Sequence, residues 1–532
     1  MESSTEPGAG PSSRTAALAG VLAVAAGLGV SELVAALLPG GASLIVAVGD
    51  FIIDVVPGWV ERAVISAFGT ADKPVLIASI LLVSAAVGSG LGLLAARRFI
   101  LGAAGLAVLA TVAVAAAAAD PRTSPGAALL TGLAYGLAGA GALWSLVRAA
   151  TPSAVPASDP EPAKRVPVAI ERPADGRTVD RRRFLRLAGI TAVVAGVAAT
   201  GSRLITGSER VERIRQAIRI PRPARPAPPP PPGADLEIPG LAPLYVPNEE
   251  FFRIDTALRV PQIDPADWSL AVRGRVDRPF RLSYADLMAM PQIEADITLA
   301  CVSNEVGGGL VGNARWQGVP LHVLLDRAGL RAGATQLVGR SVDGFTAGFP
   351  TLTALDVRES MVAVAMNGEP LPATHGFPAR LIVPGLYGYV SATKWLSAIE
   401  LRGWDEVEGY WIPRGWAKRG PVKTQSRIDV PGPSATIAAG RRPIAGVAWA
   451  PTRGIERVEV RIDDGPWREA TLAARLDVDC WRQWFMPWEA TPGRHLIAVR
   501  ATDGTGEVQT DERTPVAPDG ASGRHTVAVV VT

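Results

Sequence analysis

The chain has 532 residues, 48% of them hydrophobic and only 19% charged, with a net charge of +3. This length allows two or three domains, and the small net charge, without basic stretches interleaved with aromatic residues, argues against nucleic-acid binding. The two cysteines, Cys301 and Cys480, are too few for a disulfide framework, although they could form one bridge.

The first 206 residues are rich in Ala, Gly, Leu and Val and contain four apolar runs of membrane-spanning length. A helix of roughly 20 apolar residues crosses a bilayer. We predict a cytoplasmic tail over residues 1–14 and a membrane domain of about five helices over residues 15–206. The four strong runs cover residues 16–38, 74–96, 99–119 and 127–147, and a weaker fifth run covers 187–205.

Basic residues set the expected orientation of these helices. With five spans, Arg14, Arg97 and the basic residues from Arg148 to Arg186 all fall on one side, which the positive-inside rule makes the cytoplasm. The short apolar stretch 43–56 contains Asp50 and Asp54, so we expect it to be interfacial or re-entrant. We therefore predict a multi-pass protein of the cell membrane, with everything after the fifth span outside the cytoplasm.

A motif at residues 180–186, DRRRFLR, precedes the weak fifth run. It resembles a twin-arginine export signal, except that Asp180 stands where Ser or Thr is usual. Alternatively, the arginines only anchor a helix on the cytoplasmic side. The twin-arginine route carries folded domains, and a folded passenger usually means a cofactor inserted before export.

A Pro-rich linker is expected over residues 207–240. Its segment 221–233, PRPARPAPPPPPG, favours an extended polyproline conformation of about 3.1 Å per residue, or roughly 40 Å in all. We predict that it is a stiff spacer that lifts the following domains off the membrane.

Two soluble domains follow, each with its own pattern. Residues 241–416 mix strands, such as 268–276 and 297–300, with short helices at 284–290 and 322–328, which is typical of an α+β domain. Residues 417–532 show short alternating strands at regular spacing, which favours a β-sandwich.

Two clusters in the α+β domain carry chemistry. Cys301 ends an apolar strand and opens the polar loop CVSNEVGGG. It is either a small buried residue or a thiolate ligand whose metal takes its other ligands from a cofactor, because no CxxC or His cluster accompanies it. The second cluster, residues 375–395, combines a Gly- and Pro-rich loop with Arg380 and Lys394. These groups suit a phosphate, although a packed loop with ordinary surface charges is the alternative.

The same clusters resemble the sulfite oxidase family of molybdopterin-dependent oxidoreductases. TLACVSNEVGG is similar to the segment with the family's molybdenum-ligating cysteine, and MNGEPLPATHGFPARLIVPG is similar to its pterin-binding stretch. KTQSRIDVP, from residue 423, resembles the start of the family's Ig-like dimerisation domain. The resemblance covers residues 245–532 and implies an α+β molybdopterin domain followed by an Ig-like β-sandwich, behind the α-helical membrane domain.

The resemblance also implies roles for individual residues. Cys301 would ligate molybdenum, in a Mo-molybdopterin cofactor without haem. Asp343 lies near the position of an acidic residue that contacts the pterin. The cofactor-binding set implied for this chain comprises Arg253, Asp255, Cys301, Asn304, Asp343, His375, Arg380, Thr393 and Lys394.

The chain departs from the family pattern at its substrate site. Glu305 follows Asn304 where sulfite oxidases have an arginine, and Trp416 replaces a substrate-site tyrosine, while Arg414 is kept. We expect Cys301, Arg414 and Trp416 to act on a small sulfur or nitrogen substrate, either an oxyanion such as sulfite or an S-oxide or N-oxide. Electrons would pass to or from a separate partner, and the dimerisation domain leaves a homodimer open. The alternative function is a non-catalytic, membrane-anchored binding protein with a degenerate molybdopterin domain.

Overall fold

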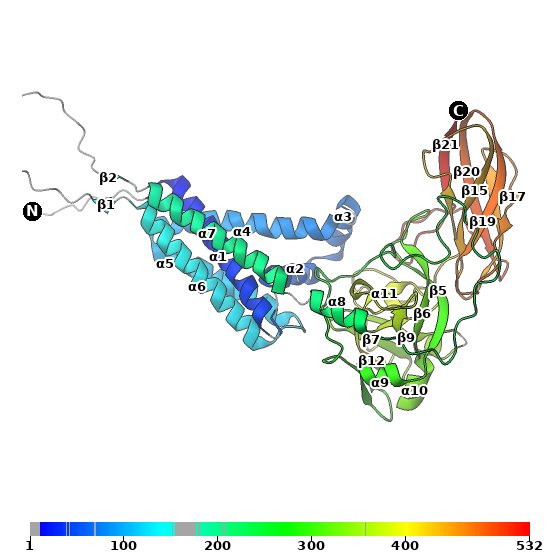
Figure 1. Ribbon diagram of the computed structural model, residues 1–532, viewed down its shortest axis with the longest axis horizontal. Coiled ribbons are helices and arrows are strands. Elements are labelled where there is room, and N and C mark those ends of the chain that lie inside the picture. The colour runs from blue at the N-terminus through cyan, green and yellow to red at the C-terminus, as the bar shows by residue number, and fades with distance from the viewer. Residues whose placement is uncertain are drawn as a thin grey trace, which may run out of the picture. The chain divides into compact units, whose positions relative to one another are not determined.

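A computed structural model describes residues 11–532 apart from 39, 42, 69–70, 152, 155–176, 179–180, 206–207 and 357 (Figure 1). Asp180, the first residue of the export motif, lies outside the described residues. The chain divides into two compact units, Met1–Gly207 and Ser208–Thr532.

Helices dominate the first unit. Among the described residues, α1, α4, α5 and α6 are long and apolar enough to cross a membrane, and they coincide with the four strong apolar runs of the sequence. The weaker fifth span falls in α7, which is 25 residues long, and its membrane role stays a prediction. The helices are α1 (Ser13–Leu37), α2 (Leu44–Val55), α3 (Gly58–Phe68), α4 (Asp72–Arg97), α5 (Phe99–Ala119), α6 (Pro125–Ala150) and α7 (Arg181–Ile205), and the two-residue strands β1 (Ser153–Ala154) and β2 (Arg177–Thr178) pair with each other.

Small residues let the helices of this unit approach closely. A Cβ added to Gly92 of α4 would lie 2.0 Å from the backbone oxygen of Ala16 in α1, and one added to Gly29 of α1 would lie 2.6 Å from that of Ala195 in α7. Ala19 of α1 packs with residues near the end of α6 and the start of α7. α1 therefore runs antiparallel to α4 and α6 and parallel to α7. This arrangement gathers Arg14, Arg97, Arg98, Arg148, Arg181, Arg182 and Arg183 at one end of the helices.

The outward faces of these helices are apolar. Leu82, Ile100 and Leu137 are more than two-thirds exposed, and Val193 and Val197 of α7 are 63% and 66% exposed. Water-facing helices normally carry polar side chains at such positions. The first unit therefore has the surface expected of a membrane anchor.

The second unit begins with α8 (Ser208–Ala217) and builds an α+β domain from two sheets. One sheet has the strand order β10-β9-β6-β5, with β11 also paired to β9, and the other has the order β4-β3-β12-β7-β8. β12 runs parallel to β3, and the other pairs are antiparallel. The elements are β3 (Ser269–Gly274), β4 (Phe280–Ser283), α9 (Tyr284–Ala289), β5 (Ile293–Ala300), β6 (Val311–Pro320), α10 (Leu321–Ala328), β7 (Gln336–Ser341), β8 (Thr346–Pro350), β9 (Met361–Met366), β10 (Glu369–Pro370), β11 (Arg380–Ile382), α11 (Gly388–Ser391) and β12 (Leu396–Arg402).

The C-terminal part is a two-layer β-sandwich (Figure 1). One layer has the order β13-β15-β19-β18 and the other β14-β21-β20-β16-β17, and side chains such as Ile444, Trp484, Val458 and Val499 share one core. The strands are β13 (Gln425–Val430), β14 (Thr436–Ile437), β15 (Gly440–Trp449), β16 (Ile455–Ile462), β17 (Arg468–Glu469), β18 (Thr471–Leu472), β19 (Arg482–Ala490), β20 (Gly493–Asp503) and β21 (Thr526–Val531).

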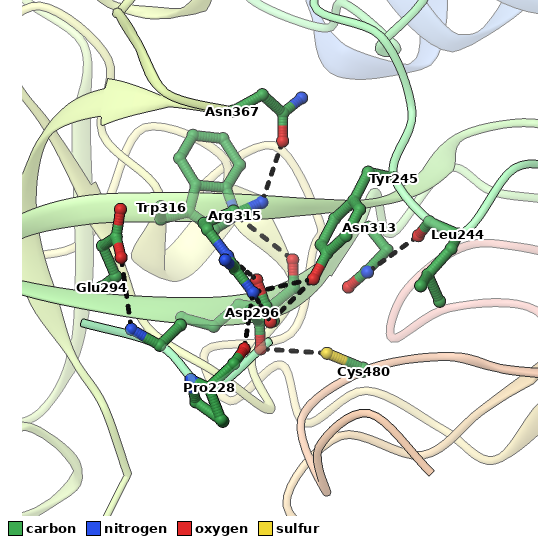
Figure 2. Close-up of polar contacts among 12 residues, drawn as sticks. Pro228, Leu244, Tyr245, Glu294, Asp296, Asn313, Arg315, Trp316, Asn367 and Cys480 are labelled. Atoms are coloured by element: carbon green, nitrogen blue, oxygen red, sulfur yellow. Dashed lines mark hydrogen bonds and ion pairs between the residues drawn. The ribbon is translucent and has the colours of Figure 1, made fainter. Parts of the chain in front are cut away.

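The Pro-rich segment is not a free spacer, so that prediction is wrong. The N–H of Glu294 in β5 donates to the oxygen of Arg225 at 2.9 Å, and the N–H of Ala224 donates to the oxygen of Gln292 at 2.8 Å. The Arg315 side chain donates to the oxygen of Pro228 at 3.0 Å (Figure 2). β5 is an edge strand of its sheet, and the extended segment satisfies backbone groups that such an edge leaves unpaired.

The α+β domain and the sandwich are joined by buried contacts. The Cys480 thiol donates to the backbone oxygen of Asp296 in β5 at 3.0 Å (Figure 2), and Thr298 Oγ1 accepts the N–H of Trp481 at 2.7 Å. Cys301 and Cys480 are both free, so the bridge between them does not form. The loop of the sandwich that carries Cys480 thus packs on the strand that leads to Cys301.

Candidate functional site

Cys301 stands directly after β5, where the sheet gives way to a polar loop. Its N–H donates to the oxygen of Leu310 at 2.9 Å, and its own oxygen accepts the N–H of Asn304 at 3.1 Å. The side chain is buried, and burial raises the pKa of the thiol, while hydrogen bonds from Ser303 oppose that shift. A bound metal ion would reverse the effect of burial, because a coordinating thiol loses its proton.

Asn304 shapes the loop after Cys301. Its Oδ1 accepts the N–H of Leu310 at 2.7 Å, and a Cβ added to Gly308 would lie 2.7 Å from the same atom. The Asn304 side chain therefore connects the start of the loop to its end at Leu310.

Two of the predicted cationic residues, Arg253 and Lys394, meet around one carboxylate. Asp255 Oδ2 lies 3.1 Å from Lys394 Nζ and 2.8 Å from Arg253 Nε. Lys394 Nζ also donates to the oxygen of Thr374 at 3.1 Å. Two cations thus share one buried carboxylate, which leaves this cluster with net positive charge.

Arg380 opens β11 and is buried. Its Nη1 donates to the oxygen of His375 at 3.0 Å, and its guanidinium lies 5.2 Å from the ring centre of Trp316. His375 Nε2 lies 2.9 Å from the oxygen of Asn248. Burial lowers the pKa of Arg380 to about 9. Burial also lowers the pKa of Lys394 to about 8, although Asp255 opposes this shift. Burial and the two nearby cations lower the pKa of His375 to about 4.

One pocket brings five of the predicted residues together. It holds about 760 Å³ of empty space, part of it open to solvent, and its lining includes Asp255, Cys301, Asp343, Arg380 and Lys394. Asp343 turns its Oδ1 toward the N–H of Phe345, at 3.1 Å. The remaining predicted residues do not line this pocket in the described part of the chain, namely Arg253, Asn304, His375, Thr393, Arg414 and Trp416.

The pocket suits an anionic cofactor bound beside a thiolate ligand. Among the described residues, several buried polar atoms have no hydrogen-bond partner, and one of them, Arg380 Nε, belongs to a residue that lines the pocket. His375 Nδ1 and Thr393 Oγ1 also have no hydrogen-bond partner, but these two residues are not in the lining. Buried polar atoms are normally satisfied, so unpaired ones at a pocket call for a ligand. The described residues contain no group of three His, Cys, Asp or Glu side chains that could hold a metal ion, so a metal at Cys301 would need further ligands from a cofactor. The donor set thus fits a pterin-bound metal with a phosphate.

Aromatic residues that the sequence did not single out also line the pocket. Rings of Phe345, Tyr410, Trp411, Trp416 and Tyr389 touch in that order, with centroids 5.7, 5.2, 6.3 and 5.9 Å apart, and we call them the aromatic chain. Phe345, Trp411 and Tyr389 line the pocket. Trp416 contacts Trp411 and Tyr389 but does not itself line the pocket, and its predicted role at the substrate stays a prediction. The concentration of aromatics in residues 404–416 was the signal for this wall.

Arg414 faces the aromatic chain from outside the pocket. Its guanidinium lies 3.7 Å from the ring centre of Tyr410, and its Nη1 donates to the oxygen of Tyr410 at 2.8 Å. The structure therefore places Arg414 against a ring and outside the pocket that Cys301, Arg380 and Lys394 line.

Comparison with known proteins agrees with this donor set. Residues 257–411 match the family model "Oxidoreductase molybdopterin binding domain". The chain is 36% identical to "Uncharacterized oxidoreductase YuiH" of Bacillus subtilis (strain 168) over 157 residues, which cover 30% of this chain and 76% of that protein. It is 30% identical to mitochondrial sulfite oxidase of Rattus norvegicus over 319 residues, which cover 51% of this chain and 58% of the relative.

Among solved structures, the sulfane dehydrogenase SoxCD of Paracoccus pantotrophus matches with a TM-score of 0.48 and 24% identity, over 54% of this chain and 81% of that one. The chain spans 58% of the length of the mitochondrial sulfite oxidases of Rattus norvegicus, Mus musculus and Homo sapiens. It belongs to the family of molybdopterin-binding oxidoreductases that includes the sulfite oxidases.

Proposed function

We propose that this chain is a membrane-anchored molybdenum-cofactor oxidoreductase that transfers an oxygen atom to or from a small sulfur or nitrogen compound. The observation that carries the proposal is the pocket in which the Cys301 thiol lies among the same lining residues as Arg380 and Lys394. A thiolate ligand and a buried cationic cradle are the two features that a molybdenum–pterin phosphate needs from a protein. The intact donor set argues against a degenerate domain that only binds partners.

The chain's own residues would divide the work. Arg380, Lys394 and Thr393 would hold the pterin and its phosphate, with His375 as a further donor from its Nδ1. Cys301 would fix the metal at the end of β5, and the cofactor would supply the redox and oxygen-transfer chemistry. Asp255 would keep Lys394 charged despite burial, since the carboxylate raises a pKa that burial lowers.

The catalytic domain is proposed to lie outside the cytoplasm. The gathering of basic residues at one end of the helices, with α7 parallel to α1, supports the orientation inferred from charge. The twin-arginine-like motif at the start of α7 supports export of a folded, cofactor-loaded domain. Protease treatment of spheroplasts tests this: cleavage between the helices and the catalytic domain without lysis is expected, and protection until lysis would place the domain in the cytoplasm.

A separate electron-transfer partner is part of the proposal, since a multi-step redox cycle needs an electron exit. The sandwich is proposed to be Ig-like and to pair two copies of the chain.

Activity of the purified full-length protein tests the proposed reaction. Sulfite would be assayed with an artificial electron acceptor, and S-oxides and N-oxides with reduced viologen. The wild type should turn over at least one of these substrates, and Cys301→Ser should reduce turnover by several orders of magnitude. A protein that binds molybdenum and pterin but turns over neither class would contradict oxygen-atom transfer on small sulfur and nitrogen compounds.

A further inference from the structure

The sheet β4-β3-β12-β7-β8 carries four arginines on one face, and we call them the arginine patch: Arg273, Arg281, Arg340 and Arg402. Arg281 and Arg340 stand at the two ends of one row across four strands, with two buried alanines, Ala271 and Ala398, between them. Arg273 follows Ala271 by two positions on β3, and Arg402 follows Ala398 by four positions on β12. Residues two positions apart in a strand point to the same side, so the four arginines share this face.

Three of these arginines share one carboxylate, that of Glu400. Its Oε1 lies 2.6 Å from Arg273 Nη2 and 2.9 Å from Arg340 Nε, and its Oε2 lies 3.3 Å from Arg402 Nη2. The Glu400 side chain is 2% exposed, whereas each of the three arginine side chains is at least about a third exposed. Burial raises the pKa of Glu400, but hydrogen bonds from Arg340 and Arg273 lower it overall, so the carboxylate stays ionised. The arginine patch therefore combines four positive charges with one negative charge and presents guanidinium groups to solvent.

The acidic residues that follow β12 do not cancel this excess. Asp405 lies 3.5 Å from Lys418 Nζ, and Glu406 forms an ion pair with Arg275. Glu408 is exposed, and so is Arg419, which offsets its charge. In the described structure, β3, β4, β7 and β12 expose no large apolar side chain. Permanent interfaces are large and apolar, whereas electron-transfer encounters are small and polar, so this face suits a transient, charged partner.

Two strands of the arginine patch end at the pocket that contains Cys301. Ser341 is the last residue of β7 and directly follows Arg340, while Lys394 and Trp395 directly precede β12, and all three of these neighbours line the pocket. The N–H of Val342 donates to the oxygen of Trp395 at 2.9 Å, which joins the two strand ends. At about 3.3 Å per residue, the row that contains Arg340 crosses β12 about 10 Å from Trp395. A protein bound to the arginine patch would therefore lie on strands that lead directly to the cofactor pocket.

We propose that the arginine patch is the docking surface for an acidic protein that carries one electron at a time. The inference rests on the proposed function, which needs a separate electron-transfer partner, and it assigns the surface that this partner binds and the sign of the partner's charge. Opposite charges steer two proteins together and raise their association rate by about 10- to 1,000-fold, an effect that salt weakens.

Each oxygen atom transferred moves two electrons, so the carrier must dock twice in each turnover. When the substrate is oxidised, water supplies the oxygen, two protons are released, and two carrier molecules are each reduced by one electron. When the substrate is reduced, two reduced carriers each give one electron, and the oxygen leaves with two protons as water.

The test uses full-length, molybdenum-loaded protein in detergent and three variants. The double variant Arg340→Gln, Arg402→Gln removes two charges and leaves Glu400 its contacts with Arg273. Arg281→Glu reverses one charge at an exposed arginine whose Nη1 donates to Ser269 Oγ at 2.6 Å, and it serves if the double variant does not fold. The control is the double variant Arg468→Gln, Arg494→Gln, which removes two exposed arginines of the sandwich.

Stopped-flow absorbance gives the second-order rate constant for electron exchange with an acidic carrier protein. The carrier is an oxidised c-type cytochrome of net negative charge if the wild type oxidises its substrate, and reduced flavodoxin if it reduces it. At low ionic strength, either patch variant should lower this rate constant about tenfold, and added salt should lower it in the wild type. The sandwich control should stay within about twofold of wild type. Turnover with small artificial carriers should not change in any variant, because such carriers need no docking surface.

Three outcomes would overturn the inference. The first is a rate constant in the patch variants equal to that of the sandwich control. The second is a wild type that turns over with artificial carriers but exchanges no electrons with the acidic carrier. The third is a patch variant that changes its oligomeric state and keeps its rate constant, which would assign the arginine patch to a second copy of the chain. In all three cases turnover with artificial carriers leaves the proposed function standing, whereas a wild type without such turnover would remove both.

Discussion

Replacing Arg315 by methionine would leave the Asp296 carboxylate buried without its guanidinium partner. Arg315 Nε and Nη2 each lie 2.8 Å from an oxygen of Asp296, and Tyr245 Oη donates to the same carboxylate at 2.9 Å (Figure 2). The Asp296 side chain is 3% exposed and that of Arg315 is 24% exposed. Arg315 also donates to Pro228, so the contact joins β5 and β6 to the Pro-rich segment.

Removal of one partner from a buried ion pair costs about 3–5 kcal/mol, and the partial exposure of Arg315 places this pair near the lower value. Domains of 150–250 residues lose about 2–4 °C in Tm per kcal/mol, so Arg315→Met should lower the unfolding temperature by about 6 °C or more. The measurement is thermal unfolding of the full chain in detergent, followed by tryptophan fluorescence.

Two controls separate the buried charge from general damage. Arg331→Met breaks an ion pair with Asp277 in which both side chains are 60% exposed, and it should cost at most about 1 kcal/mol. The double variant Arg315→Met, Asp296→Leu removes both charges and should recover most of the loss. If Arg315→Met lowers Tm no more than Arg331→Met does, the reasoning is refuted.

Three further predictions concern other parts of the chain. Burial raises the pKa of Asp479 to about 6 in the folded protein. The folded state therefore costs nothing extra below about pH 4, where this carboxyl is protonated in both states, and the protein loses stability as the pH rises through 6. Asp479→Asn, which can still accept the Thr452 N–H, should therefore stabilise the protein by roughly 3 kcal/mol at pH 7.5 but not at pH 4 in urea unfolding, and an equal difference at both pH values would contradict this. Arg380→Met should lower bound pterin more than tenfold while circular dichroism stays unchanged, and full pterin content would show that its buried guanidinium does not hold the cofactor. Gly92→Leu should separate α1 from α4 and reduce the folded yield in detergent. Gly90→Leu should not, because a Cβ built at Gly90 has no atom of another segment within 4 Å.

Local sequence patterns predicted the elements that lead into the site. The apolar run before Cys301 is β5, and the polar loop after it is the loop that Asn304 closes. The alternating residues around Val458 are β16, and residues 322–328 lie in α10. These predictions held because strand and helix periodicity depend on near neighbours in the sequence.

Contacts between distant segments could not be predicted in this way. Asp255 and Lys394 are 139 residues apart, and only the family resemblance placed both near the pterin. The Pro-rich segment was taken for a spacer because composition does not reveal an edge strand some 70 residues further on. Within residues 404–416, the chain turns so that the N–H of Trp416 donates to the oxygen of Trp411 at 3.3 Å. Trp411 lines the pocket and Trp416 does not, and their positions in the sequence do not distinguish them.

Molybdenum and pterin content of the purified full-length protein, wild type beside Cys301→Ser, is the most direct test of the central claim. We expect about one molybdenum and one pterin per chain in the wild type, and X-ray absorption should show a disturbed metal coordination in the variant. If wild-type protein made with an intact cofactor supply and export route contains neither metal nor pterin, the chain is not a molybdenum enzyme, and a membrane-anchored binding protein would then explain the retained fold.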